Sequence, residues 1–231
     1  GCGGESRVVE AFQAGLPALA VATALTGVLA FLAVPLTSTR RSYLSGLSAA
    51  AVAYIIVAII LVLSPLAPGF SRWLLLVVIA PVVEETCRLI AAYPNRTAQP
   101  WRGWIAFGVA YACLESGLKF GDTVALLGQM QQGWVAALVI LATPIVPFLL
   151  HVFLSVLIFA LLAVGVGRDK VLVAAILLHG LHNFSVIRLL PQDIPTLAVS
   201  ASIRSLLFVA LIWAVFEWAK RQRPAVEAAP G

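Results

Sequence analysis

The sequence predicts an all-α protein, a polytopic bundle of about seven transmembrane helices, or eight if one further segment inserts. Three observations lead to this fold class. Of the 231 residues, 61% are hydrophobic and only 11% are charged, whereas a soluble domain carries about 25% charged residues. Several apolar runs reach the roughly 20 residues that a helix needs to cross a bilayer. Basic residues stand singly or in pairs at the ends of these runs, where they act as topology signals.

The length allows a single transmembrane domain that covers residues 1–231. Residues 1–15 form a polar N-terminal segment, and residues 219–231 form a basic C-terminal tail. Seven apolar runs are predicted to cross the bilayer: residues 16–36, 43–66, 73–93, 104–120, 144–166, 171–190 and 197–218. Turn-rich segments separate them, among them residues 94–103, the basic turn 168–170 and the proline-flanked break 191–195.

The region between the fourth and fifth spans is ambiguous. As one helix, the apolar run 134–166 would be about 50 Å long, more than a bilayer of roughly 30 Å needs. Pro144 and Pro147 interrupt it, so we expect residues 134–143 to form a short interfacial or re-entrant helix. The alternative is that residues 122–143 make an eighth crossing.

The distribution of Lys and Arg predicts the orientation. With seven crossings, one side of the membrane holds nine of these residues, and the other side holds four. The positive-inside rule then places the C-terminus in the cytoplasm and the N-terminus outside, and it disfavours an eighth crossing. An Arg-rich and Ala-rich composition is typical of a GC-rich genome, which predicts a bacterial cytoplasmic membrane. The net charge of +5 is too dispersed for a nucleic-acid surface, so the expected surroundings are the lipid bilayer and a protein substrate.

The third span contains Glu84, Glu85 and Arg88 about half-way along. A carboxylate at the bilayer centre costs on the order of 2.5–3.5 kcal/mol, so it requires a partner or a function. Adjacent residues point about 100° apart on a helix. Glu84 and Arg88 share a face at a spacing of four, which permits an ion pair and leaves open which glutamate faces water.

Other spans bring polar side chains to a similar depth. Measured from the cytoplasmic end of each span, Glu84, Glu115, His179 and His182 lie within roughly 5 Å of a common level, at about 1.5 Å per residue. His151 lies about 6 Å nearer the outer face on the same rise, and Asn183 shares a helical face with His179. This convergence predicts a polar site inside the bundle.

Structural roles are the alternative for each residue. Glu115 has Lys119 four residues after it and Tyr111 four residues before it as local partners. His151 alone could be a packed, hydrogen-bonded histidine, and His182 points away from the face of His179. Pro81 frees the carbonyl of Val77 one turn before the acids, so it either kinks the helix or widens the site.

Carboxylates, imidazoles and an amide in a dry pocket suit hydrolysis. A carboxylate can take a proton from water, and imidazole or amide N–H groups can stabilise an oxyanion. Alternatively, Glu84, His151 and His179 could hold a divalent metal, and imidazole with carboxylate ligands suits Zn²⁺. The HEXXH signature of many zinc proteases is absent from the sequence, so the choice between no cofactor and zinc stays open.

Four short motifs resemble those of PrsW-type intramembrane proteases. Glu84-Glu-Thr-Cys-Arg88 resembles their Glu-Glu-x-x-(Lys/Arg) motif, and the helix Gly108 to Glu115 resembles their Gly-rich helix that ends in Glu. Leu178-His-Gly-Leu-His-Asn183 resembles their late histidine helix, and His151 fits the histidine in between. The resemblance covers about residues 73–188.

PrsW-type proteins belong to a wider group with the CAAX prenyl proteases, which show Glu-Glu-x-x-x-Arg, Phe-x-x-x-His and His-x-x-x-Asn. His179 and Asn183 match the last of these. Arg88 stands one residue closer to the glutamates, and Phe148-Leu-Leu-His151 is one residue shorter. Both departures favour the PrsW branch.

The predicted function is therefore an intramembrane or membrane-interface endopeptidase. The resemblance implies a membrane-anchored substrate such as an anti-sigma factor. Glu84 would activate water with help from His151, His179 and Asn183 would bind the oxyanion, Glu85 and Glu115 would orient or ligate, and Arg88 and His182 would support them. A non-catalytic scaffold, like that of the presenilin complex, and a proton-coupled transporter are the alternatives.

Overall fold

The computed structural model describes residues 38–63, 73–95, 101–129, 145–189 and 194–227. Within these ranges every regular element is a helix, which confirms the all-α prediction. Three described helices have stretches long and apolar enough to cross a membrane: Thr39–Ile60, Ile145–Ala163 and Val199–Gln222. The first predicted span, 16–36, and the predicted re-entrant segment, 134–143, lie outside the described residues.

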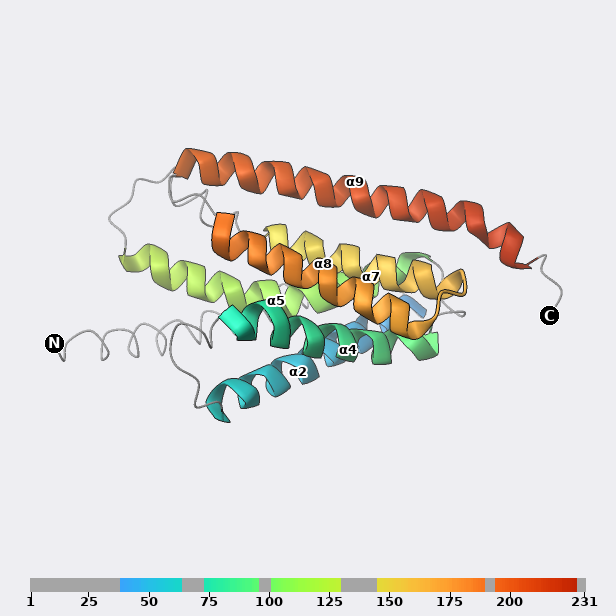
Figure 1. Ribbon diagram of the computed structural model, residues 1–231, viewed down its shortest axis with the longest axis horizontal. Helices are drawn as coiled ribbons and strands as arrows, with labels where there is room; N and C mark the ends of the chain where they lie inside the picture. The colour runs from blue at the N-terminus through green and yellow to red at the C-terminus, as the bar shows by residue number, and fades with distance from the viewer. Residues whose placement is uncertain (1–37, 64–72, 96–100, 130–144, 190–193, 228–231) are drawn as a thin grey trace.

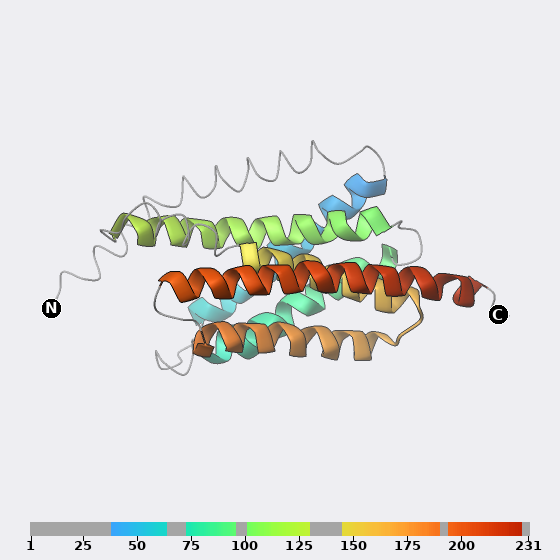
Figure 2. The same cartoon turned by 90° about the horizontal axis from the view of Figure 1, so that it is seen from above.

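The described chain forms a bundle of antiparallel helices (Figure 1). Its elements are α2 (Ser38–Leu63), the π-helical turn η1 (Leu75–Ile79), α4 (Ala80–Ala92), the 3₁₀ turn η2 (Tyr93–Asn95), α5 (Trp101–Gln129), α7 (Ile145–Ala163), α8 (Arg168–Leu189) and α9 (Ile194–Glu227). Successive long helices alternate in direction, and α9 lies across α7 with α5 to one side and α8 to the other (Figure 2).

One end of the bundle collects basic side chains. It holds the first turns of α2, α5 and α8 and the last turns of α4, α7 and α9 (Figures 1 and 2). The described basic residues of the first turns are Arg40, Arg41, Arg102, Arg168 and Lys170, and Lys220 and Arg221 lie about two turns before the end of α9. We call this end the basic end.

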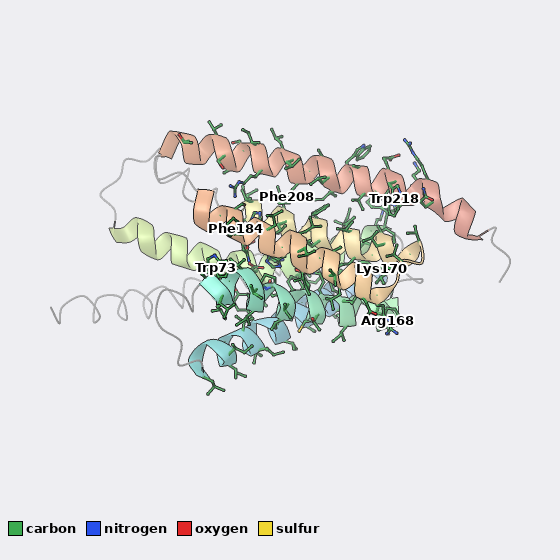
Figure 3. All side chains as sticks on the ribbon, viewed as in Figure 1. Trp73, Arg168, Lys170, Phe184, Phe208 and Trp218 are labelled. Carbon is green, nitrogen blue, oxygen red and sulfur yellow. The ribbon has the colours of Figure 1, made fainter. Side chains whose placement is uncertain are left out.

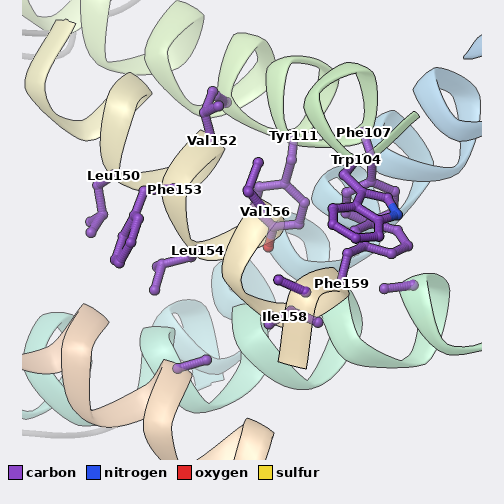
Figure 4. Close-up of a cluster of buried hydrophobic side chains, with 14 of the residues drawn as sticks. Trp104, Phe107, Tyr111, Leu150, Val152, Phe153, Leu154, Val156, Ile158 and Phe159 are labelled. Carbon is purple, nitrogen blue, oxygen red and sulfur yellow. The ribbon is translucent and has the colours of Figure 1, made fainter. Parts of the chain in front are cut away.

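Helix α7 is the central helix and α9 is peripheral. In the most apolar stretch of α7, 67% of the residues are buried inside the bundle, whereas only 6% are buried in the most apolar stretch of α9. Phe159 of α7 packs between two aromatic rings of α5, with centroid distances of 6.0 Å to Trp104 and 5.3 Å to Phe107 (Figure 4). The exposed apolar side chains of α9 suit a lipid-facing surface.

Two glycines set the helix spacing around α5. A Cβ added at Gly46 of α2 would overlap the backbone of Phe107, and one at Gly108 of α5 would lie 3.0 Å from the Cα of Val152 on α7. Small residues at such contacts let membrane helices approach closely. Gly108 thus permits the close packing of α5 against α7.

The chain changes helical register just before the two glutamates. The N–H of Ala80 bonds to the carbonyl of Leu75, five residues back, which is the π pattern. The next residue, Pro81, has no N–H to donate. The carbonyl of Leu76 therefore loses both Ala80, its α-helical partner, and Pro81, its π-helical partner. The sequence predicts that Pro81 either kinks the helix or widens the site; in the structure, the helix adopts a π turn immediately before Pro81.

Several predicted boundaries differ from the structure. The turn predicted at 168–170 is wrong, because these residues form the first turn of α8; the actual turn is 164–167, where Gly165 has a φ of +83°. Helix α5 continues past the predicted end at 120 to Gln129, and α9 continues past 218 through part of the basic tail to Glu227. Polar residues near helix ends mark the edge of the apolar layer, whereas the helix itself runs on.

Candidate functional site

Four helices bring six polar side chains together in the interior of the bundle. Glu84, Glu85 and Arg88 come from α4, Glu115 from α5, His151 from α7 and His179 from α8. Each is buried, with at most 8% of its surface exposed. All six are among the site residues predicted from the sequence, although the common depth singled out only Glu84, Glu115 and His179 of them, and we call the six the buried cluster.

Glu85 forms a close ion pair with Arg88. Nη1 of Arg88 lies 2.7 Å from Oε1 and 2.6 Å from Oε2 of Glu85, and neither side chain is exposed. The spacing is three residues, whereas the pair permitted by the sequence spacing of four was Glu84 with Arg88. In this three-residue pair, Glu85 also reaches His179 on α8, and this second contact favours it.

The second amino group of Arg88 determines the tautomer of His151. Nη2 of Arg88 lies 2.5 Å from Nδ1 of His151. A guanidinium only donates hydrogen bonds, so Nδ1 must accept and carries no hydrogen. The hydrogen of the imidazole is then on Nε2, which contacts Oε2 of Glu115. Glu115 thus has an acceptor role toward α7 in place of the predicted local bond from Tyr111.

The same reasoning assigns His179. Its Nδ1 lies 2.7 Å from Oε1 of Glu85, whose carboxylate is held ionised by Arg88. An ionised carboxylate only accepts, so Nδ1 of His179 donates, and in the neutral imidazole its Nε2 then keeps a lone pair. Nε2 lies 3.9 Å from Oε2 of Glu84. Two acceptor atoms therefore face each other across a gap that suits a positively polarised group, either a water donating to both or a cation.

Glu84, His151 and His179 form the one group of potential metal ligands found among the described residues. Each offers an atom, and the three atoms lie within 4.8 Å of one another. Ligands about 2.1 Å from a tetrahedral zinc would be roughly 3.4 Å apart, so small side-chain rotations would complete a site. His179 already has the carboxylate partner on its far nitrogen that zinc-binding histidines usually have. His151 could ligate only through Nε2, in exchange for its contact with Glu115.

Tyr111 belongs to this centre, although the sequence did not single it out as a site residue. Its ring lies 4.0 Å from Cζ of Arg88 and 5.6 Å from the ring of His151. Its hydroxyl donates to the backbone carbonyl of Glu84 at 3.2 Å. One buried tyrosine therefore contacts three members of the cluster. Its position one turn before Glu115 was the available signal.

Asn183 and His182 make other contacts. Nδ2 of Asn183 donates to the carbonyl of Leu76 at 2.8 Å, which is the carbonyl that the π turn leaves without a helical partner. The ring of His182 packs against Phe208 of α9 at 5.6 Å. Asn183 was predicted from the face it shares with His179; that face meets η1 one turn away from the cluster.

Gly180 lies beside His179 and permits this close contact. A Cβ at Gly180 would lie 2.7 Å from the carbonyl oxygen of Val77 in η1. Through these two residues, Gly180 and Asn183, α8 packs closely against the π turn. The approach places His179 opposite Glu84 and Glu85.

Comparison with protein-family models, with curated proteins and with solved structures finds no match to this chain. The resemblance to PrsW-type proteases therefore rests on the four motifs. Three of them contribute to the buried cluster directly, through Glu84, Glu85 and Arg88, through Glu115, and through His151. The fourth contributes His179.

Proposed function

We propose that the protein is an intramembrane or membrane-interface endopeptidase that hydrolyses a peptide bond in a membrane-anchored protein. The observation that carries this proposal is the pair of facing acceptors, Oε2 of Glu84 and Nε2 of His179, 3.9 Å apart inside the bundle. A single water that donates one hydrogen to each atom would span roughly 4 Å. Hydrolysis needs a water held in this way beside a base.

Glu84 is the proposed base. Glu85 is occupied by Arg88 and His179, whereas Glu84 faces the gap. In the proposed reaction, Glu84 takes a proton from water as the water oxygen bonds to the peptide carbonyl carbon. The C–N bond then breaks, and Glu84 returns the proton to the leaving nitrogen. In the zinc-bound alternative, Glu84, His151 and His179 would hold the ion in place of the base and donor roles described here, and the ion would supply Lewis-acid activation of the water and the carbonyl.

His151 is the proposed oxyanion donor. In the tautomer assigned above, its Nε2 carries the hydrogen and Arg88 contacts its other nitrogen. To stabilise a developing negative charge, this hydrogen would move from its contact with Oε2 of Glu115 to the oxyanion, while Arg88 keeps the ring in place. Asn183, which the sequence suggested for this role, donates to Leu76. We therefore assign Asn183 to positioning of α8.

The proposed membrane arrangement has seven spans with the basic end in the cytoplasm. Three described helices have the length and hydropathy of spans, and the others carry the polar residues of the cluster, which lower their hydropathy. The first turns of α2, α5 and α8 at the basic end hold five basic residues and one acid, Asp169. Cytoplasmic loops collect Lys and Arg in this way. A single-span protein from the same membrane is the substrate class that could reach the site.

A proton-relay function is disfavoured by the position of Arg88. The hydrogen-bonded series from Glu115 through His151 to Glu85 passes through this guanidinium. A guanidinium is not deprotonated in proteins, so it cannot receive a proton on one side and release one on the other.

The test is cleavage of a panel of single-span proteins by purified protein in nanodiscs, with metal analysis of the same sample. Glu84→Gln should reduce cleavage by about 10²–10⁴-fold, the usual contribution of a general base. Glu217→Gln on α9 is the matched control and should cleave as wild type. Equal cleavage by Glu84→Gln and wild type would rule out the proposed mechanism. Folded protein that cleaves no member of the panel would favour the scaffold.

A further inference from the structure

A hollow opens between α5 and α9 at the basic end. It has a volume of about 250 Å³ and is lined by Trp101, Trp104, Phe216, Ala219 and Lys220. Trp104 and Ala219 are almost fully buried, at 2% and 4% exposed, and form its floor, whereas Trp101, at 42%, stands at its rim. The lining is thus apolar, and the exposed Lys220 is its one charged residue.

The aromatic rings of the lining are fixed by mutual contacts. The rings of Trp101 and Phe216 meet edge to face at 5.1 Å. Trp104 stacks on Phe159 of the central helix α7 at 6.0 Å with an interplanar angle of 5°. These contacts join three helices, so the hollow is a built feature of the bundle.

The charges around the hollow have the sign that attracts an anion. Lys220 belongs to the lining, Arg102 lies with Cζ 5.5 Å from the ring of Trp101, and Arg221 follows Lys220. The nearest acid in sequence on α9 is Glu217. Arg168, Lys170 and Trp218 lie toward the same end of the molecule, while Trp73 lies toward the other end (Figure 3).

We propose that this hollow binds an anionic phospholipid of the surrounding bilayer. One acyl chain would occupy the space against Trp104 and Phe216, and the phosphate would bond to Lys220. Three features select this ligand: an apolar interior for hydrocarbon, tryptophan at the depth of the headgroups, and a cation at the mouth. A volume below the 300–1,000 Å³ of small-molecule pockets suits part of a chain better than a whole soluble ligand.

This inference is independent of the proposed hydrolase activity. It requires only that the chain lies in a bilayer with its basic end at one interface. Juxtamembrane basic residues are worth about 1 kcal/mol each toward anionic lipid, which corresponds to about fivefold in affinity.

The test uses protein in nanodiscs made of equal parts of phosphatidylglycerol and phosphatidylcholine with identical chains. Native mass spectrometry then measures which lipid stays bound on release. We expect one retained phosphatidylglycerol in wild type, and a ratio of phosphatidylglycerol to phosphatidylcholine about fivefold lower in Lys220→Ala. Lys170→Ala, at the same end but on α8, is the charge-matched control and should keep the wild-type ratio.

A second pair of measurements tests the acyl-chain position. Ala219→Leu should fill the hollow and remove the retained lipid without a change in charge. Quenching of tryptophan fluorescence by phosphatidylglycerol with brominated chains should fall in Trp101→Phe, an exposed position where folding is safe. Equal retention of both lipids by wild type, an equal effect of Lys220→Ala and Lys170→Ala, or unchanged quenching in Trp101→Phe would overturn the proposal.

Discussion

The hydrogen bond from Asn183 to Leu76 leads to a prediction that separates a structural from a catalytic role. Asn183→Leu keeps the approximate volume but removes the only side-chain donor that the structure places on this carbonyl among the described residues. A buried acceptor left without a donor costs about 1–3 kcal/mol. Because Asn183 is half-buried, we expect a loss of about 1–2 kcal/mol in the free energy of unfolding.

Pro81→Ala supplies the matching rescue. Leu76 lacks a helical partner because Ala80 bonds to Leu75 and Pro81 has no N–H. An alanine at 81 restores an N–H five residues after Leu76, so the helix can satisfy this carbonyl itself. In the Pro81→Ala background, Asn183→Leu should therefore cost less than about 0.5 kcal/mol, which gives a coupling of about 1 kcal/mol.

The assay is unfolding in mixed micelles at increasing SDS fraction, followed by circular dichroism, with cleavage measured on the same four proteins. Ser185→Ala is the control, because the Ser185 hydroxyl bonds only locally, to His182, at 2.7 Å. Equal costs of Asn183→Leu in the two backgrounds would refute the reasoning about the π turn. Cleavage that stays lost in the double variant while stability returns would instead make Asn183 a catalytic residue.

Three further predictions concern the buried cluster. Arg88→Met should lower the free energy of unfolding by about 3–5 kcal/mol, because it leaves the buried Glu85 carboxylate without its cationic partner. The double variant Arg88→Met, Glu85→Gln should recover at least half of this loss in the same micelle assay. Additive losses from the two substitutions would contradict the ion pair. Tyr111→Phe removes one hydrogen bond and should lower the free energy of unfolding by about 1 kcal/mol. Tyr111→Leu also removes the ring beside Arg88, and its cleavage rate should be at least tenfold below that of Tyr111→Phe. Equal cleavage rates of the two variants would show that the ring only fills space. Gly180→Ala should push α8 away from the π turn and reduce cleavage by about tenfold or more. Gly167→Ala is the control and should cleave as wild type, because no atom lies within 4 Å of the new Cβ. Equal activities of the two variants would show that the contact at Gly180 does not position His179.

Much of the fold could be predicted because hydrophobicity in a bilayer reports directly on helices. The helical class and the presence of membrane-spanning helices are visible in the apolar runs, and the six described long helices correspond to predicted spans. Helix ends were predicted less well. The turn expected at Arg168 is helical, because charge marks the edge of the bilayer and Gly165 with its positive φ is the residue that reverses the chain.

The six members of the buried cluster could be predicted as site residues from buried charge, depth and motif, although depth also selected His182, which packs against Phe208; their pairing could not be predicted. Spacings of three and four both place an acid beside Arg88 on a helix. The choice of Glu85 depends on His179, which is 94 residues away from it in the sequence. Depth also cannot reveal a π turn. Asn183 was therefore predicted to bind the oxyanion together with His179, whereas its amide donates to the carbonyl of Leu76.

In the proposed seven-span arrangement, the short separation of Glu85 and Arg88 has a consequence for how α4 would enter the membrane. Helix α4 is synthesised well before α7 and α8, so at insertion neither histidine is present to accompany its charges. A pair three residues apart can close within the helix itself and cancel the opposite charges before any neighbour arrives. His151, 63 residues after Arg88, and His179 then dock onto a segment that is already electrically balanced. In that arrangement, α4 would enter the bilayer with its two central charges already paired.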